Sequence, residues 1–362
     1  MTADPRPVCL VTSAVTPYRA DPFRMLARLE GLEVIAFRDA GPRIEGLTVR
    51  VVDEVGAARL AASGAYRAVI CGLGGRVALP GAYAGARRAG VPFVLWASLW
   101  AHPRTFAHVL SLGPMRLIYR HADAVVTYGP HVSAYVAARR GSSNGIFEAP
   151  QAVDGRHFGA AVSERARSLA RERLGAPGDA FAALFVGRLE PEKGGQVRLD
   201  AWRRSGLGRV GSLSMAGTGP LAPIVQRLGG GVRSLGSLDA DDLPALYAAA
   251  DVLVLPSIQT ATFREPWGLV VNESMHQGTP VIASDAVGAV AGGLVRHERN
   301  GLVAPQRDPD ALAALLRRAA ADRGLRERLG AAAREDVSEF SFDAWVAGMR
   351  RALAAVGAGR EG

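Results

Sequence analysis

The chain has 362 residues, of which 49% are hydrophobic and 21% charged, a composition typical of globular proteins with substantial cores. Its formal charge is +9; residues 1–158 hold 18 arginines and 11 acidic residues (+7), and residues 159–362 hold the other 25 basic and 23 acidic residues (+2). The basic residues are scattered and accompany no nucleic-acid-binding motif, which argues against nucleic acid as a partner. The sequence contains no run of about 18 apolar residues, which is the length that predicts a membrane span.

The first residues lead directly into an apolar run without a signal-peptide pattern, so we expect a cytoplasmic protein. The excess positive charge of the first half is compatible with peripheral contact between that half and an anionic membrane, at its inner face. Cys9 and Cys71 lie in apolar runs and have no metal-binding spacing. We therefore expect no metal and no other cofactor.

Short apolar runs alternate with helical stretches along the first half of the chain. The runs that predict strands are 8–13, 34–37, 49–52, 68–71, 93–96, 124–128 and 146–149. The stretches that predict helices are 22–29, 57–62, 81–89, 105–120 and 130–138. Repeated alternation of this kind predicts an α/β fold with a mostly parallel, doubly wound sheet.

The same alternation continues through the second half. Strands are predicted at 182–186, 213–216, 232–236, 251–257 and 281–283, and helices at 165–174, 243–250, 309–318, 324–333 and 340–353. A Pro-Gln-Ala-Val-Asp segment, 150–154, separates the halves. We place the domains at 1–158, 159–338 and 339–362.

The first motif with chemical content follows the predicted strand 182–186. It reads Gly187-Arg188-Leu-Glu-Pro-Glu-Lys193-Gly and puts two cations at the carboxyl end of a buried strand, where open α/β sheets bind ligands. Arginine presents a fork to phosphate oxygens, and lysine presents a compact charge. Lys193 is the single lysine of the chain, so its retention in an arginine-rich sequence suggests a specific need.

A second motif contains two carboxylates, Glu265 and Glu273, on either side of a Pro-Trp-Gly turn and a helix start. The turn residue Gly268 precedes the first-turn amides of Leu269 and Val270, which are expected to point outward and attract an anion. Each carboxylate can accept hydrogen bonds from hydroxyl groups. This combination suits a ligand that has both phosphates and hydroxyls.

Weaker signals lie at the ends of other predicted strands. Gly217 begins a Gly-Thr-Gly-Pro turn, and Leu235 belongs to the short strand 232–236. His102 follows an apolar strand of the first half. Tyr18 and Arg19 occupy the first strand–helix loop.

These motifs resemble the Gly-Arg-Leu-x3-Lys-Gly and Glu-x7-Glu signatures of the family 4 (group 1) retaining glycosyltransferases. That family has the GT-B fold, with two Rossmann-like doubly wound domains that face each other across a cleft. The resemblance implies that 1–158 binds an acceptor and that 159–338 binds a nucleotide-sugar donor such as a UDP- or GDP-sugar. It also implies that the helix in 339–362 crosses back to the first domain.

The resemblance also assigns roles to individual residues. Arg188 and Lys193 hold the donor diphosphate, Glu273 binds the ribose hydroxyls, and Glu265 contacts the transferred sugar. His102 matches by approximate position a cleft histidine that touches the donor sugar. The donor site is completed by Gly187, Gly217, Leu235, Gly268, Leu269 and Val270.

The function that follows is retaining, metal-independent transfer of a hexose from a nucleotide diphosphate. The acceptor could be a glycan, as in polysaccharide biosynthesis, a lipid-linked sugar or a small molecule. Two alternatives stay open. One is a GT-B nucleotide-sugar epimerase, and the other is a non-catalytic protein that binds nucleotide sugars.

Overall fold

The computed structural model describes residues 4–39, 41 and 43–360, with the side chains of 106–110 outside the description. The chain divides into two compact units: unit 1 is Met1–Gln151 with Phe342–Gly362, and unit 2 is Ala152–Ser341. The sequence predicts these boundaries after residues 158 and 338. The first differs because the short helix α6 (Gly155–Phe158) packs against helices α10 and α11 of unit 2.

The described part of unit 1 contains a seven-stranded parallel sheet in the order β3-β2-β1-β4-β5-β6-β7. Its strands are β1 (Val8–Ala14), β2 (Leu32–Asp39), β3 (Thr48–Val51), β4 (Ala68–Gly72), β5 (Phe93–Ala97), β6 (Ala124–Thr127) and β7 (Ile146–Glu148). The central strands are buried on both faces, which is why they appear in the sequence as continuous apolar runs.

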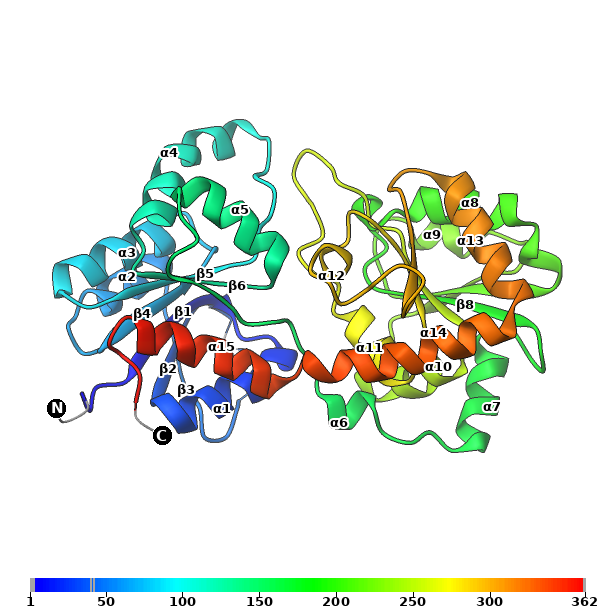
Figure 1. The fold of residues 1–362 in the computed structure, drawn as a ribbon, viewed down its shortest axis with the longest axis horizontal. Coiled ribbons are helices and arrows are strands. Elements are labelled where there is room, and N and C mark those ends of the chain that lie inside the picture. Colours follow the sequence, from blue (N-terminus) through cyan, green and yellow to red (C-terminus); the bar gives the residue numbers. More distant parts are fainter. Residues whose placement is uncertain (1–3, 40, 42, 361–362) are drawn as a thin grey trace. The chain divides into compact units, whose positions relative to one another are not determined.

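Helices cover both faces of this sheet (Figure 1). Those of unit 1 are α1 (Ala20–Glu30), α2 (Glu54–Ala61), α3 (Ala78–Ala89), α4 (Phe106–His121), α5 (Pro130–Arg140) and α15 (Phe342–Ala355). Helix α15, from the end of the chain, packs on the same face as α1, where the Trp345 ring lies 5.8 Å from Phe23 and 5.7 Å from Trp96. The core on this face therefore joins the two ends of the chain.

Unit 2 has a six-stranded parallel sheet among its described residues, in the order β10-β9-β8-β11-β12-β13. Its strands are β8 (Phe181–Val186), β9 (Gly211–Ala216), β10 (Val232–Gly236), β11 (Val252–Leu255), β12 (Val281–Ser284) and β13 (Gly301–Ala304). In each unit the chain starts a central strand, builds outward to one side and then returns to build on the other. The strand order therefore reverses between β1 and β4 in unit 1 and between β8 and β11 in unit 2.

The helices of unit 2 lie on both faces of its sheet (Figure 1). They are α6, α7 (Glu164–Arg173), α8 (Gly195–Ser205), α9 (Ala222–Val225), α10 (Leu243–Ala249), α11 (Val270–His276), α12 (Gly288–Ala291), α13 (Pro309–Ala321) and α14 (Arg323–Asp336). The sequence pattern does not predict α6, α8, α9, α12 or β13. Most of these are four residues long, but α8 has eleven, and its buried face includes Arg198 and Ser205, which interrupt the apolar periodicity.

Both sheets thus have the doubly wound architecture predicted from the sequence. Within the described residues, no helix combines the length and the apolar character needed to cross a bilayer.

Candidate functional site

The loop that follows β8 is held directly against the loop that follows β11. Gly194 ends the turn Pro191–Lys193 at a φ of 68°, and a Cβ atom there would lie 1.9 Å from the carbonyl oxygen of Pro256. The amide of Ile258 donates to the carbonyl of Glu192 at 2.9 Å. These contacts require glycine at position 194 and fix the position of Lys193 relative to the end of β11.

Lys193 and Glu265 meet at this junction. The lysine Nζ lies 2.5 Å from Oε2 of Glu265, and the hydroxyl of Ser257 donates to the same oxygen at 3.0 Å. The Glu265 residue is 5% exposed, and the Lys193 side chain is 15% exposed. The lysine also lies 5.1 Å from the centre of the Phe263 ring. The chain's single lysine is thus held in a shielded, charge-compensated position.

Arg188 occupies the same loop but is far more exposed. Its side chain is 63% exposed, and its nitrogens lie 3.5 Å from Glu190 and 3.8 Å from Glu192. Such distances and exposure make these weak, solvent-screened pairs. The guanidinium can therefore reorient towards a more highly charged partner at little cost.

Glycines bring the neighbouring strand ends together. The Gly187 amide donates to the carbonyl of Ala216 at 2.9 Å, and the Gly217 amide donates to that of Gly236 at 2.6 Å. A Cβ atom at Gly217 would lie 1.9 Å from the Gly187 carbonyl oxygen, so the backbones of the loops after β8 and β9 are in direct contact. Leu235 lies in β10, beside β9, and is half-buried.

The second predicted carboxylate lies in α11. Gly268 precedes this helix at a φ of 96°, Leu269 is its N-cap, and Val270 is its first residue. Among the described residues, the amides of Leu269 and Val270 donate no hydrogen bond.

Glu273, in the same helix, accepts a hydrogen bond of 2.6 Å from the hydroxyl of Tyr247. Burial raises the pKa of Glu273 to about 7, although the Tyr247 hydrogen bond and the charge of His157 oppose this shift. A large part of this carboxyl is therefore protonated near neutral pH.

The predicted residues of unit 2 thus come from the carboxyl ends of β8, β9, β10 and β11 and from the start of α11, and they lie at one edge of the sheet. His102 lies in unit 1, between β5 and α4, and is half-buried. Its role stays a prediction.

Two neighbours of the carboxylates, Ser257 and Tyr247, are not predicted by the sequence motifs. Ser257 could have been found, because it follows the apolar strand almost immediately. Tyr247 gave no signal, since it belongs to a short helix far from Glu273 in the sequence.

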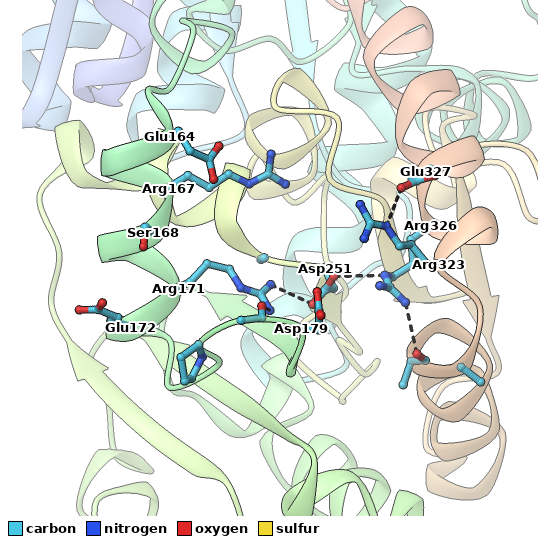
Figure 2. A pocket seen from close by; sticks show the side chains of 15 residues that line it. Glu164, Arg167, Ser168, Arg171, Glu172, Asp179, Asp251, Arg323, Arg326 and Glu327 are labelled. Atoms are coloured by element: carbon cyan, nitrogen blue, oxygen red, sulfur yellow. Dashed lines mark hydrogen bonds and ion pairs between the residues drawn. The ribbon is translucent and has the colours of Figure 1, made fainter.

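A cavity of about 860 Å³ lies at the opposite edge of this sheet (Figure 2). Its lining includes Asp179 and Asp251, which come just before β8 and β11, so it is at the amino ends of the strands. Ligands of open α/β sheets bind at the other edge.

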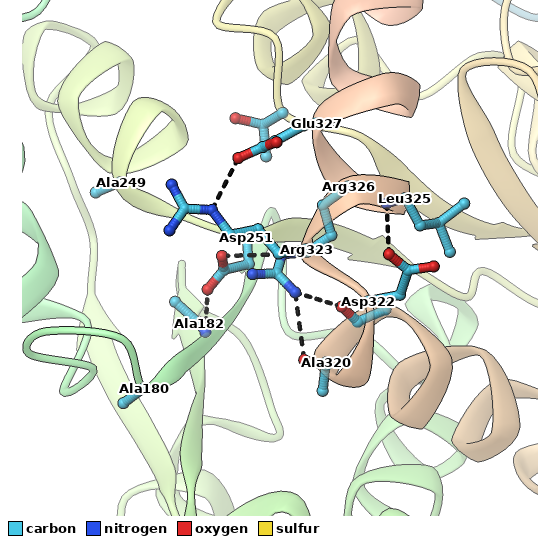
Figure 3. A network of polar contacts seen from close by, with 12 residues as sticks. Ala180, Ala182, Ala249, Asp251, Ala320, Asp322, Arg323, Leu325, Arg326 and Glu327 are labelled. Carbon is cyan, nitrogen blue, oxygen red and sulfur yellow. Dashed lines mark hydrogen bonds and ion pairs between the residues drawn. The ribbon is translucent and has the colours of Figure 1, made fainter.

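Asp251 is the centre of the polar network beside this cavity (Figure 3). Its carboxylate accepts from the Ala182 amide at 2.8 Å and pairs with Arg171 and Arg326, each at 3.1 Å. These bonds tie α7 and α14 to the starts of β8 and β11. Asp251, Arg171 and Arg326, three of the charged residues that line the cavity, therefore have a structural role.

Comparison with known proteins agrees with this geometry. Residues 166–336 match the family described as Glycosyl transferases group 1. The chain is 35% identical over 216 residues to a D-inositol 3-phosphate glycosyltransferase of Salinispora arenicola, covering 54% of this chain and 46% of that protein. It is 34% identical over 180 residues to an uncharacterized glycosyltransferase of Methanocaldococcus jannaschii, covering 48% of this chain and 44% of that protein. The matches thus span less than half the length of these relatives.

Solved structures resemble the chain over almost its full length. The Anabaena protein HepE, in complex with UDP and glucose, superposes with a TM-score of 0.77 at 20% identity, covering 97% of this chain and 100% of that one. Sucrose-phosphate synthase from Thermosynechococcus elongatus gives a TM-score of 0.71 at 22% identity, covering 98% and 99%. Residues 166–336 therefore form a group 1 glycosyltransferase domain, in a chain whose fold is that of the GT-B glycosyltransferases.

Proposed function

We propose that the protein is a retaining glycosyltransferase of family 4 that transfers a hexose from a nucleotide diphosphate to an acceptor bound by unit 1. The observation that carries the proposal is the Lys193–Glu265 pair, 2.5 Å apart at the carboxyl edge of a group 1 glycosyltransferase domain. Both relatives described above are named as glycosyltransferases, and one similar structure contains UDP-glucose. None of this favours an epimerase.

Lys193 can serve the diphosphate without leaving Glu265. An ammonium group has three donors, and Glu265 Oε2 takes one of them. The others neutralise the charge that develops on the leaving phosphate, together with the Arg188 guanidinium and the free amides of Leu269 and Val270. This is electrostatic stabilisation by groups of the chain itself, so we propose that the transfer needs no divalent metal.

The two carboxylates take the hydroxyl groups of the donor. Glu265 accepts hydrogen bonds from hydroxyls of the transferred sugar, and its position is fixed by Lys193 and Ser257. Glu273 accepts from the ribose hydroxyls when it is ionised. In a same-face substitution the leaving phosphate accepts the acceptor's proton as the new glycosidic bond forms, so no separate base residue is required.

A thermal-stability screen against UDP, GDP, ADP and dTDP, each with and without an attached sugar, tests the donor site. A selective nucleotide should raise the melting temperature in proportion to the logarithm of its concentration over its Kd. Because Lys193 is the single lysine, biosynthetic incorporation of lysine labelled with ¹³C at Cε gives one side-chain signal without altering the ammonium group, and that signal should shift when the same nucleotide is added. If no nucleotide changes either readout in a folded sample, the assignment is wrong.

The transfer reaction and its stereochemistry are tested by analysis of the reaction product. Incubation with the selected nucleotide sugar and a pool of acceptors should release the nucleoside diphosphate, and the anomeric coupling constant of the product should match that of the donor. An inverted product would contradict the retaining mechanism. Full activity in the presence of a strong chelator is expected, and loss of activity that added metal restores would contradict metal independence.

A further inference from the structure

Unit 1 has a cavity of about 280 Å³ at the point where the strand order of its sheet reverses, between β1 and β4. Its walls come from the ends of β1 and β4, from the segment after β5, and from the turn Pro17–Arg19 that precedes α1. Open α/β sheets bind ligands in this position. The volume is near the lower end of the range of about 300–1,000 Å³ for small-molecule sites, so it suits one small molecule.

Arg19 lines this cavity and is itself 6% exposed. Its guanidinium carbon lies 4.7 Å from the centre of the Trp96 ring and 5.7 Å from that of Tyr128. Nη2 donates to the Tyr128 hydroxyl at 3.3 Å and to the side-chain oxygen of Gln151. In the described part of the chain, Nε and Nη1 have no hydrogen-bond partner, and no carboxylate pairs with Arg19.

A second buried arginine of unit 1, Arg67, shows which partners a structural arginine has in this unit. Arg67 is 4% exposed, and its Nη2 lies 2.8 Å from the carboxylate of Glu30. Its other nitrogens donate to the carbonyls of Arg6 and Ala358. Within the described residues, the partners of the Arg19 guanidinium are instead aromatic rings and neutral oxygens. Because a buried cation without a counter-ion is unfavourable, its two free donors on a cavity wall indicate an anionic ligand.

The rest of the cavity wall has the same character. Its described residues include no aspartate or glutamate. Thr16 Oγ1 and the Trp96 indole nitrogen are buried and have no hydrogen-bond partner among the described residues. Ser98 adds a hydroxyl, and Tyr18, which is 43% exposed, adds an aromatic ring. Hydroxyls and a ring match a sugar or polyol, and Arg19 matches an oxyanion attached to it.

We propose that this cavity binds an anionic acceptor, a sugar or polyol that carries a phosphate monoester or a carboxylate, through a charge-assisted hydrogen bond from Arg19. The proposal rests on the proposed function, because it names the acceptor of that transfer. Nε and Nη1 of Arg19 donate to the oxyanion, Thr16 and Ser98 bind hydroxyls, and Tyr18 packs against the ring. Neutral acceptors of the same size leave the Arg19 charge uncompensated and bind more weakly.

The test uses the full chain saturated with the nucleoside diphosphate that stabilises it most, so that the donor site is filled. Glucose 6-phosphate and glucuronate are the anionic probes, and glucose is the matched neutral probe, with binding measured by calorimetry. We expect at least one anionic probe to bind about tenfold or more tightly than glucose, the factor expected for hydrogen bonds to charged groups. The stronger of the two identifies the oxyanion. Equal binding of all three probes overturns the proposal.

Two variants locate the effect. Arg19→Met should remove the preference for the anionic probe and leave nucleotide binding unchanged, whereas Arg59→Met, which removes an exposed charge on α2, should keep both. If Arg19→Met does not fold, Thr16→Val should weaken the anionic probe in a folded protein. A preference that survives both changes overturns the proposal, and so does loss of nucleotide binding in Arg19→Met, because Arg19 would then serve the donor.

The same data separate this proposal from the proposed function. Selective nucleotide binding without any preference for an anionic probe leaves the glycosyltransferase assignment intact and removes the anionic acceptor. An anionic preference that depends on Arg19, in a protein that binds no nucleotide, supports the pocket as an anion site but removes the acceptor role.

Discussion

Lys193 and Glu265 are joined by a 2.5 Å ion pair whose carboxylate oxygen also accepts a hydrogen bond from Ser257. The pair places a cation and an acceptor of hydroxyl hydrogens side by side at the carboxyl edge of the unit 2 sheet. A diphosphate sugar needs both at its reacting end, the cation for the phosphate and the carboxylate for the sugar. The opposite charges also hold each side chain in one position, which favours catalysis by preorganised groups.

Replacing Lys193 by alanine should lower kcat/KM by about 10²–10³-fold, the loss typical when one preorganised donor to a developing negative charge is removed. Lys193→Arg should restore part of this loss, since it keeps the charge but not the compact geometry. Arg203→Ala is the matched control, because this side chain on α8 is 77% exposed and its loss changes the net charge equally. Near wild-type turnover in Lys193→Ala would remove Lys193 from the site.

Glu265→Gln should separate binding from catalysis. Removing the carboxylate charge leaves the Lys193 charge uncompensated, so the affinity for a free nucleoside diphosphate should rise a few-fold, while transfer should fall because the sugar loses its acceptor. Calorimetry with the diphosphate and a steady-state assay with the nucleotide sugar measure the two effects. Weaker binding of the diphosphate would show that the main effect of Glu265 is to hold the Lys193 side chain in position and not to compensate its charge.

The sequence predicted most of the fold because parallel strands buried on both faces are continuous apolar runs. The run 8–13 corresponds to β1, which spans Val8–Ala14, and the run 281–283 corresponds to β12, which spans Val281–Ser284. Helix α8 was missed because Arg198 lies on its buried face. Periodicity cannot reveal a core helix whose core position is charged.

Grouping the site was possible for a similar reason. The carboxyl ends of parallel strands meet at one edge, so motifs after β8 and β11 had to be neighbours. The pairing of Lys193 with Glu265, and of Tyr247 with Glu273, could not be predicted, because these contacts depend on how loops and helices from distant parts of the chain pack. The same holds for Arg19, whose surroundings include Trp345 from the last helix.

Donor binding should depend on pH through Glu273. Burial raises its pKa to about 7, above the ordinary value of 4.5, so the carboxyl is mostly protonated below about pH 7 and mostly ionised above it. The ionised form is the better acceptor for ribose hydroxyls, so nucleotide affinity should rise as the pH increases through 7. Binding at slightly acid pH should therefore release a proton.

Calorimetry in two buffers of different ionisation enthalpy measures that proton directly. Glu273→Gln should abolish the release and flatten the pH profile of the nucleotide Kd, whereas Glu335→Gln, at a side chain that is 78% exposed, should change neither.

Folding stability should depend on pH in the opposite direction to nucleotide affinity. The raised pKa means that folding favours the protonated form, so wild-type stability relative to Glu273→Gln should fall as the pH rises from about 4.5 to 7. Uptake of a proton when the nucleotide binds would contradict the assignment of Glu273 to the ribose hydroxyls.

Arg198→Met should stabilise the protein by about 1–3 kcal/mol, because it replaces a buried charge with an apolar side chain of similar length. Arg198 is 0% exposed and stacks 3.6 Å from the centre of the Phe185 ring. Nη1 donates to the carbonyl of Lys193 at 3.3 Å, whereas Nε and Nη2 have no hydrogen-bond partner within the described residues. The ring contact therefore offsets only part of the cost of burial.

The pH dependence of this gain distinguishes a charge effect from better packing. Burial lowers the pKa of Arg198 to about 9, so the cost of its charge is complete below that pH and declines as the pH rises towards the ordinary value of 12.5. The stability difference between Arg198→Met and wild type, from denaturant unfolding, should therefore shrink between about pH 8 and about pH 10.5. Arg203→Met, exposed on the same helix, should stay within about 0.5 kcal/mol of wild type at both pH values. A destabilised Arg198→Met would mean that the guanidinium supports the Lys193 loop through the carbonyl contact, and nucleotide affinity should then fall with it.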